Sequence, residues 1–435
     1  LADKIRLNIK QSSAVTLNAN LNHIQLTGLD LSGSLSGASL PVSPLNIALA
    51  GGLSYQLDKQ QLNVTATRMK ANQLQANGNL GVNTSQRIAK VRFNLNSNQV
   101  NLDKLLSDLD KPKTGANTAK PSAKGSAAKS KPKSTNGEPD LSSLKNLDVS
   151  GKLKVKQLTY QQIRFANVST NFAINRGVVN LNQFNAGIYS GQVNVSGRLD
   201  VRQSTPSYQV KANVKQIQIQ PLLKALASYD KLTGRGNMTL NASGRSLKSQ
   251  NLKRNLTGST TLSVNNGVLY GMNIPYQIRK NYALIKGRKI PAESETTKFS
   301  SFKGRFDFKS GVARTKNLAL NAQGIKVTGQ GQANYVKENM DFKVQADISK
   351  ISDPNGKPIK ELAGVSVPIR ITGPWSSLNY QLDLKGLLKT QALQKVNEKA
   401  KSKIDKEIER FTDGDKEKAE VLKNAADSLL KGLFN

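Results

Sequence analysis

The stretch LDVSGKLKVK, residues 147–156, alternates small or apolar residues with polar ones at every second position. The side chains that fall on one face of an extended chain are Leu147, Val149, Gly151, Leu153 and Val155. Lysines fall on the other face, at positions 152, 154 and 156. A period of two is the signature of a half-buried β-strand, because successive side chains in a strand point to opposite faces. This stretch therefore predicts a strand with one apolar and one cationic face.

The same alternation recurs on both sides of this stretch. It is clear in residues 193–200, 342–348 and 378–384, and the chain holds on the order of two dozen such segments. Turn-forming pairs such as those in Asn175–Gly177 and Asn265–Gly267 separate them. The sequence therefore predicts long antiparallel meanders.

Helical patterns are fewer. Two short helices are predicted at residues 102–109 and 221–227, the second with a proline at its first position. Apolar residues that step by three or four also predict two amphipathic helices at the C-terminus, over residues 387–411 and 419–433.

Residues 111–140 break the pattern. Lys, Pro, Ser, Ala, Thr and Gly replace the aromatic and β-branched aliphatic residues there, and seven lysines precede the first acidic residue, Glu138. Such a composition is typical of a disordered linker. We therefore expect an N-terminal β-rich piece at 1–110, the linker at 111–140, a β-groove domain at 141–386 and a helical tail at 387–435.

Composition excludes several classes of protein. The chain has no cysteine and a single histidine, His23, so thiolate zinc sites and a His-dependent catalytic triad are not expected. Acidic residues are scattered singly rather than paired for acid–base chemistry. The sequence predicts no enzyme, no metal and no cofactor.

The net charge of +35, from 64 Lys and Arg against 29 Asp and Glu, points to an anionic partner. The positive residues are spread along the polar faces of the strands without the interleaved aromatics of a nucleic-acid platform. We therefore expect attraction to an anionic membrane surface and no nucleic-acid binding. Trp375 is expected to be a turn or rim residue.

A sheet that is apolar on one face must cover that face. Composition and periodicity leave two arrangements open. Ordinary β-sandwiches would bury facing sheets against each other, whereas a long twisted sheet could curl into an elongated apolar groove that holds acyl chains.

Three stretches resemble the AsmA family. They are residues 234–271 (GRGNMTLNASGRSLKSQNLKRNLTGSTTLSVNNGVLYG), residues 297–348 (TKFSSFKGRFDFKSGVARTKNLALNAQGIKVTGQGQANYVKENMDFKVQADI) and residues 367–384 (VPIRITGPWSSLNYQLDL). The third has Ser376-Ser377-Leu378 where a proline is often found in the family. The glycines in these stretches recur at fixed distances from aromatic positions.

The resemblance implies a periplasmic protein that an N-terminal helix preceding Leu1 anchors to the inner membrane. It also implies relationship to chorein-type bridge-like lipid transfer proteins, whose elongated β-groove conducts phospholipid between membranes in support of outer-membrane assembly. The expected fold is mainly β, a long twisted antiparallel sheet curled into an apolar groove, with short helices and C-terminal amphipathic helices.

The expected partners are phospholipid, an anionic membrane surface and outer-membrane assembly factors. The alternative is a non-catalytic envelope scaffold for those assembly factors, with its apolar faces packed together. The side chains expected to face lipid are the inward residues of the alternating segments: Leu153, Val155, Val193, Val195, Leu199, Phe306, Phe308, Leu318, Leu320, Phe342, Val344, Ile348, Ile369, Ile371, Tyr380 and Leu382.

Overall fold

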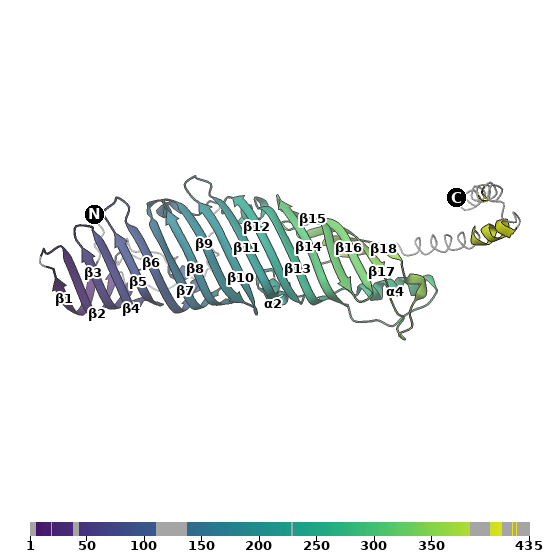
Figure 1. The fold of residues 1–435 in the computed structure, drawn as a ribbon, viewed down its shortest axis with the longest axis horizontal. Helices are drawn as coiled ribbons and strands as arrows, with labels where there is room; N and C mark the ends of the chain where they lie inside the picture. Colours follow the sequence, from purple (N-terminus) through teal and green to yellow (C-terminus); the bar gives the residue numbers. More distant parts are fainter. Residues whose placement is uncertain are drawn as a thin grey trace, which may run out of the picture. The chain divides into compact units, whose positions relative to one another are not determined.

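The computed structural model describes residues 6–18, 20–37, 43–109, 137–227, 229–382 and 401–410, with positions 420 and 423. These residues form nineteen strands of a single sheet and only a few short helices (Figure 1). All but one of the pairings described below are antiparallel. The predicted mainly β fold with a long antiparallel sheet is confirmed.

The chain divides into two compact units. The first comprises residues 1–267, 302–315 and 333–337, and the second comprises 268–301, 316–332 and 338–435. The strands are β1 (Arg6–Leu17), β2 (His23–Ser36), β3 (Leu45–Gln56), β4 (Gln61–Ala71), β5 (Leu74–Asn83), β6 (Lys90–Asn101), β7 (Asp148–Tyr160), β8 (Ile163–Asn175), β9 (Val178–Ile188), β10 (Gly191–Asp200), β11 (Ser207–Gln218), β12 (Arg235–Arg245), β13 (Thr257–Tyr270), β14 (Thr296–Lys309), β15 (Val312–Ala322), β16 (Ile325–Asn334), β17 (Asn339–Ile348), β18 (Ser366–Pro374) and β19 (Asn379–Leu382).

In the first unit each strand from β1 to β13 pairs with the next strand in the chain. The predicted linker, most of which lies outside the described residues, falls between β6 and β7. These two strands pair in parallel, Lys90 opposite Asp148 and Leu95 opposite Leu153. The two β-rich pieces on either side of the linker therefore form one continuous stretch of sheet.

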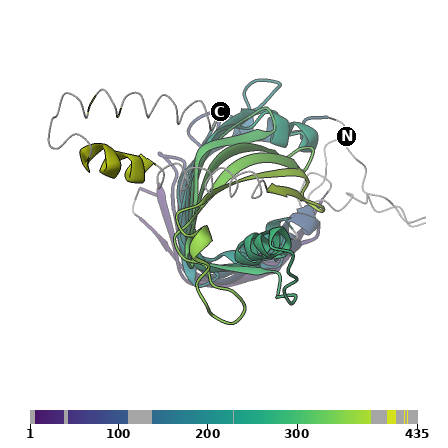
Figure 2. The same cartoon turned by 90° about the vertical axis from the view of Figure 1, so that its right-hand side faces the viewer.

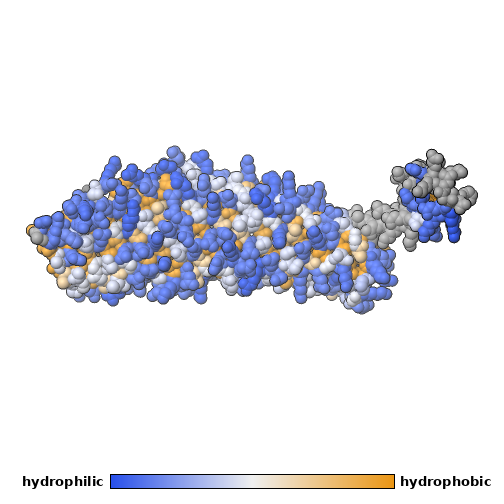
Figure 3. All heavy atoms as spheres, viewed as in Figure 1, coloured by the Kyte–Doolittle hydropathy of each residue, from blue (hydrophilic) through white to orange (hydrophobic). Residues whose placement is uncertain are grey.

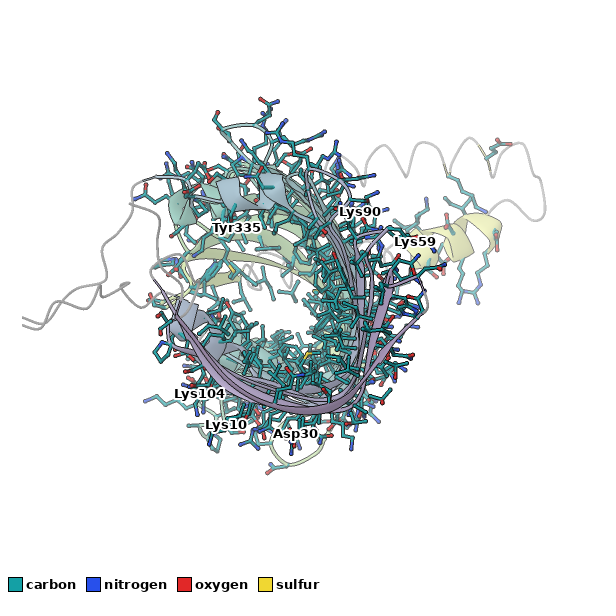
Figure 4. The ribbon with its side chains drawn as sticks, turned by 90° about the vertical axis from the view of Figure 1, so that its left-hand side faces the viewer. Lys10, Asp30, Lys59, Lys90, Lys104 and Tyr335 are labelled. Atoms are coloured by element: carbon teal, nitrogen blue, oxygen red, sulfur yellow. The ribbon has the colours of Figure 1, made fainter. Side chains whose placement is uncertain are left out.

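The strands of the first unit are bent. Seven of their pairings contain a register shift, for example between Leu26 and Leu29 on β2 and between Val214 and Ile217 on β11. A bulge inserts an extra residue in one strand, which bends that strand and increases its twist. Figure 4 shows the result in β1–β6, which curve with Lys10 and Asp30 on the outside.

Helices lie at both edges of this curved stretch. At one edge α1 (Leu102–Leu109) follows β6 and α2 (Ile219–Ala227) follows β11. At the opposite edge lie η1 (Ser142–Asn146) and α3 (Ser249–Arg254). The Asp103 carboxylate of α1 accepts the backbone N–H of Gln161, in the turn between β7 and β8, at 2.9 and 3.0 Å. This bond ties α1 to the sheet edge.

The second unit has a tightly packed core. Its helix α4 (Ile274–Ile285) buries Ile278 completely, and Figure 2 shows this helix on the concave side of the strands. Thr297 of β14 holds the start of α4, because its hydroxyl donates to the carbonyl of Met272 (2.8 Å) and accepts the N–H of Ile274 (3.0 Å). A turn that includes η2 (Lys360–Leu362) buries Leu362 and Val365 beside β17.

The helices predicted at 102–109 and 221–227 are present. In the predicted tail, residues 401–410 are helical, and most of the rest lies outside the described residues. None of the helices in the described part of the chain combines the length and the hydropathy that a transmembrane helix needs.

Candidate functional site

Three rows of apolar, glycine or uncharged residues cross the first unit on one face, each formed by residues directly opposite one another in neighbouring strands. Row 1 crosses β1 to β13: Val15, Leu26, Leu53, Val64, Leu80, Phe93, Gly151, Phe172, Leu181, Gly197, Val210, Ala242 and Gly258. Row 2 crosses β1 to β12: Leu17, Ile24, Tyr55, Leu62, Val82, Val91, Val149, Ile174, Val179, Leu199, Tyr208 and Gly244. Row 3 crosses β2 to β13: Leu29, Gly51, Ala66, Gly78, Leu95, Leu153, Thr170, Phe184, Val195, Ala212, Leu240 and Thr260. None of these positions carries a charge.

The opposite face has a different character. The row of partners between rows 1 and 2 is polar or small: Thr16, Gln25, Ser54, Asn63, Gly81, Arg92, Ser150, Ala173, Asn180, Arg198, Gln209, Ser243 and Thr257. Figure 3 shows this outer face, on which hydrophilic residues predominate over β1–β13. Since Lys10 and Asp30 lie on the outside of the curve in Figure 4, the three apolar rows line its inside.

The apolar rows are only partly covered by protein. Most large side chains in row 1, such as Leu80, Phe93 and Phe172, are partly exposed, and Val15 is 60% exposed. Side chains that faced a second packed layer would be buried to the level of a protein core. Thirteen strands at about 4.8 Å spacing give this face a span of roughly 60 Å.

Aromatic side chains bridge the parallel junction between β6 and β7. The ring of Phe93 lies over Gly151, where an added Cβ would come within 2.5 Å of the ring. Phe93 also contacts Phe172 edge-on, with ring centroids 5.5 Å apart. Row 1 is therefore continuous where the chain changes from the first β-rich piece to the second.

A small core closes the rows at the α1 edge. Val100, Val155, Val168 and Ala186 are buried there, and Leu153 and Val193 pack against them. The interior is thus packed near this edge and more exposed along rows 1 and 2.

Several of the residues expected from the sequence to face lipid lie directly opposite one another in neighbouring strands, as Val344 and Ile369 do in the second unit. In the first unit Leu153 and Val195 belong to row 3, and Leu199 belongs to row 2. Of the other residues expected to face lipid in this unit, Val193 and Phe306 are partly exposed, and Val155 and Phe308 are buried.

In the second unit most of them lie in a packed core. The buried ones are Leu320, Phe342, Val344, Ile348 and Ile369. Those that are partly exposed are Leu318, Ile371, Tyr380 and Leu382. Their assignment as lipid-facing stays a prediction.

Sequence reasoning singled out no inward residue before position 141. Alternation was visible there, because Val91, Phe93 and Leu95 occupy every second position of β6. These residues continue the rows of the later strands.

Other candidate residues are structural. His23 Nε2 lies 2.9 Å from the hydroxyl of Ser54 on the neighbouring strand. Trp375 is 41% exposed in the turn after β18, and its backbone N–H donates to the carbonyl of Glu338. Within the part of the chain that the structure describes, no three His, Cys, Asp or Glu residues gather as a metal site would need.

Comparison with known proteins identifies the relationship. Residues 2–318 match the model of the AsmA family. Protein AsmA of Escherichia coli (strain K12) is 24% identical over 385 residues, which cover 87% of this chain and 61% of that protein. The chain thus spans about three-fifths of this relative's length. No solved structure gave a significant match.

Proposed function

Since this chain belongs to the AsmA family, we propose that it is a periplasmic protein that shields phospholipid acyl chains on its curved apolar face during passage between the inner and outer membranes. In this proposal an N-terminal membrane helix anchors the protein to the inner membrane, and the protein acts as a conduit rather than a catalyst. Its role supports assembly of the outer membrane.

The observation that carries this proposal is the uncharged surface of rows 1 to 3, on which most large side chains of row 1 stay partly exposed, although Leu29, Val64, Ala66 and Ala242 are buried. An exposed apolar surface of this extent marks an interaction site in a soluble protein. An acyl chain is about 15 Å long, half of the roughly 30 Å hydrocarbon core of a bilayer, so the span of the rows equals about four such chains laid end to end.

Acyl chains suit this surface better than a folded partner. Contact with hydrocarbon is non-directional, so an acyl chain can cover a face that offers mainly apolar side chains and no charged group. A continuous set of equivalent apolar positions also lets the acyl chain move from one strand to the next without losing contact with the protein. A conduit requires this property.

The test places charges on the inner face and on the outer face of the same two strands. Leu80→Glu with Phe172→Glu puts two carboxylates in row 1, and Asn79→Glu with Asn171→Glu puts them at the neighbouring positions that point outward. The wild-type protein and each variant are purified from cells, and the phospholipid bound to each is measured by extraction and mass spectrometry. We expect phospholipid with the wild type and the outer-face variant, and a several-fold loss with the inner-face variant, because a carboxylate against hydrocarbon costs several kcal/mol.

A phospholipid with a photoactivatable acyl chain gives a second measurement on the unmodified protein. Cross-links are expected at positions of the three rows. Wild-type protein free of phospholipid, with cross-links absent from the rows, would contradict the proposal and favour an envelope scaffold. This result does not depend on how well the charged variants fold.

A further inference from the structure

The outer face of the first unit contains a pocket that the apolar rows do not explain. It is a hollow of about 710 Å³ at the sheet edge opposite α1 and α2, where β10 and β12 end and β11 and β13 begin. Its size falls in the range of small-ligand sites. The end of β14 and the turn after it complete the wall.

Four cationic side chains line this pocket: Arg198, Arg245, Arg254 and Lys309. They come from four different elements, β10, β12, α3 and β14. All four residues are exposed. The only carboxylate in the lining is Asp200, which accepts hydrogen bonds from the Arg202 guanidinium and has Arg198 at 3.7 Å. The pocket therefore holds an excess of positive charge that its own acidic residue does not neutralise.

The pocket lining also includes two residues of row 2. Tyr208 and Gly244, which end row 2, contribute to the wall, and the hydroxyl of Tyr208 lies over Gly244. That hydroxyl oxygen is buried and has no hydrogen-bond partner in the described residues, and the same holds for the hydroxyl of Tyr335 nearby. A buried hydroxyl without a partner is uncommon in folded proteins. The pocket thus lies at the sheet edge, beside the end of row 2.

We infer that this pocket binds the phosphate of a phospholipid headgroup, whose acyl chains reach the adjacent apolar rows. Arginine guanidinium groups bind phosphate oxygens through paired N–H donors, and charge-assisted bonds of this kind are the stronger class of hydrogen bond. A phosphate monoester or free phosphate shares this chemistry, so the acyl chains distinguish the lipid from those sources. This inference rests on the proposed function for the apolar part of the ligand, and on the pocket alone for the phosphate.

The test uses the full chain and two probes, dihexanoyl phosphatidylglycerol and inorganic phosphate, in calorimetric titrations at fixed salt. Arg245→Glu with Arg254→Glu reverses two charges in the pocket. Lys211→Glu with Lys215→Glu makes the same change in net charge on outward positions of β11 outside the pocket. Arg245→Gln with Arg254→Gln serves as a milder variant, and thermal melting monitors folding.

We expect the wild type to bind the short-chain lipid at least about tenfold more tightly than inorganic phosphate, because its chains add apolar contact. Both pocket variants should weaken the lipid at least about tenfold through loss of charge-assisted bonds, while the Lys211 and Lys215 variant stays within about twofold. Equal weakening by the pocket and control variants would overturn the inference in favour of a diffuse cationic face. Equal affinity for the two probes would overturn the lipid as the source of the phosphate.

The two proposals fail separately. The variant with carboxylates in row 1 should bind inorganic phosphate as the wild type does, because Leu80 and Phe172 lie outside the pocket. Unimpaired phosphate binding by a wild-type protein that carries no acyl lipid would contradict the conduit and leave the phosphate site intact. Loss of acyl lipid only in the row variant, with no effect of the pocket variants, would contradict the headgroup site and leave the conduit intact.

Discussion

The parallel junction between β6 and β7 provides a sharp test of how the apolar rows are built. Gly151→Ala adds one methyl group at the point where the Phe93 ring covers the backbone. The added Cβ would lie 2.5 Å from Cδ2, 2.6 Å from Cε2 and 2.6 Å from Cγ of that ring. Rotation of the ring about its own axis leaves Cγ in place, so the whole side chain must move.

The cost of Gly151→Ala follows from three effects. Overpacking of this kind costs about 1–3 kcal/mol. Loss of the edge-on contact with Phe172 costs a further ~0.5–1.5 kcal/mol. Replacement of a strand glycine by alanine returns about 0.5–1 kcal/mol, because alanine loses less backbone entropy on folding. We expect a net destabilisation of roughly 0.5–4 kcal/mol.

Gly81→Ala is the matched control. Gly81 lies on the outer face of β5, and its nearest neighbour to an added Cβ is the Asn63 side-chain oxygen at 3.4 Å. The same substitution should there stabilise the protein by about 0.5–1 kcal/mol. The two variants are therefore expected to shift the urea unfolding midpoint in opposite directions.

A double-mutant cycle completes the assay. Phe93→Leu removes the ring, so Gly151→Ala should cost at least about 1 kcal/mol less in that background than in the wild type. If Gly151→Ala and Gly81→Ala raise the midpoint equally, the ring does not pack on Gly151 as described. The argument for a continuous row 1 across the junction would then be refuted.

Three further perturbations address other parts of the molecule. Thr297→Val should destabilise the second unit by about 2–4 kcal/mol in urea unfolding, because the carbonyl of Met272 and the N–H of Ile274 lose their hydrogen-bond partner. The neighbouring Thr296→Val should change stability by under about 1 kcal/mol. Equal effects of the two substitutions would contradict the anchoring of α4 by Thr297. The pKa of Asp200 is lowered to about 2 by the hydrogen bond from Arg202. The contribution of the Asp200 carboxylate to stability should therefore be complete above the ordinary aspartate pKa and disappear as the pH falls from near 4 to 2. In the variant Arg202→Gln, carboxyl NMR should show a higher pKa for Asp200. An unchanged Asp200 pKa would contradict its pairing with Arg202. Tyr208→Phe removes a buried hydroxyl that has no partner in the described residues, so the ligand-free protein should melt at the same or a higher temperature, and a loss of stability above about 1 kcal/mol would reveal a bond that the structure does not contain.

Strand formation and face parity could be predicted from the sequence. The pattern in residues 147–156 gives the inward and outward positions of β7 correctly, since Leu153 is partly exposed inside and the flanking lysines are exposed outside. Alternation is a local property and needs no partner strand. The turn predicted at Asn175–Gly177 falls at the junction of β8 and β9, whereas the turn predicted at Asn265–Gly267 is wrong, because those residues lie inside β13.

Pairing across the linker could not be predicted. Alternation has the same period whether a strand pairs in parallel or antiparallel fashion, so nothing in β6 or β7 specifies their parallel register. A linker of about thirty residues is long enough to return the chain to either edge.

The packed core of the second unit and the cationic pocket depend on contacts between distant residues. Val344 is buried, and no feature of its own strand distinguishes it from a groove residue. The pocket brings Arg198 and Arg245 together with Lys309 from three separated strands. In the sequence each is one more cation on an outward face.

The bulges, by contrast, leave a trace in the sequence. In β2 the inward residues change from even to odd positions, from Leu26 to Leu29, at the register shift. The same change occurs in β4 between Ala66 and Met69, and in β11 between Val214 and Ile217. An extra residue would turn the following part of a strand inside out, unless the apolar pattern slipped by one position at the same place. Because the pattern slips where each of these strands bulges, the sequence specifies the bend and the apolar interior together: curvature is gained without bringing a polar side chain onto the inner face.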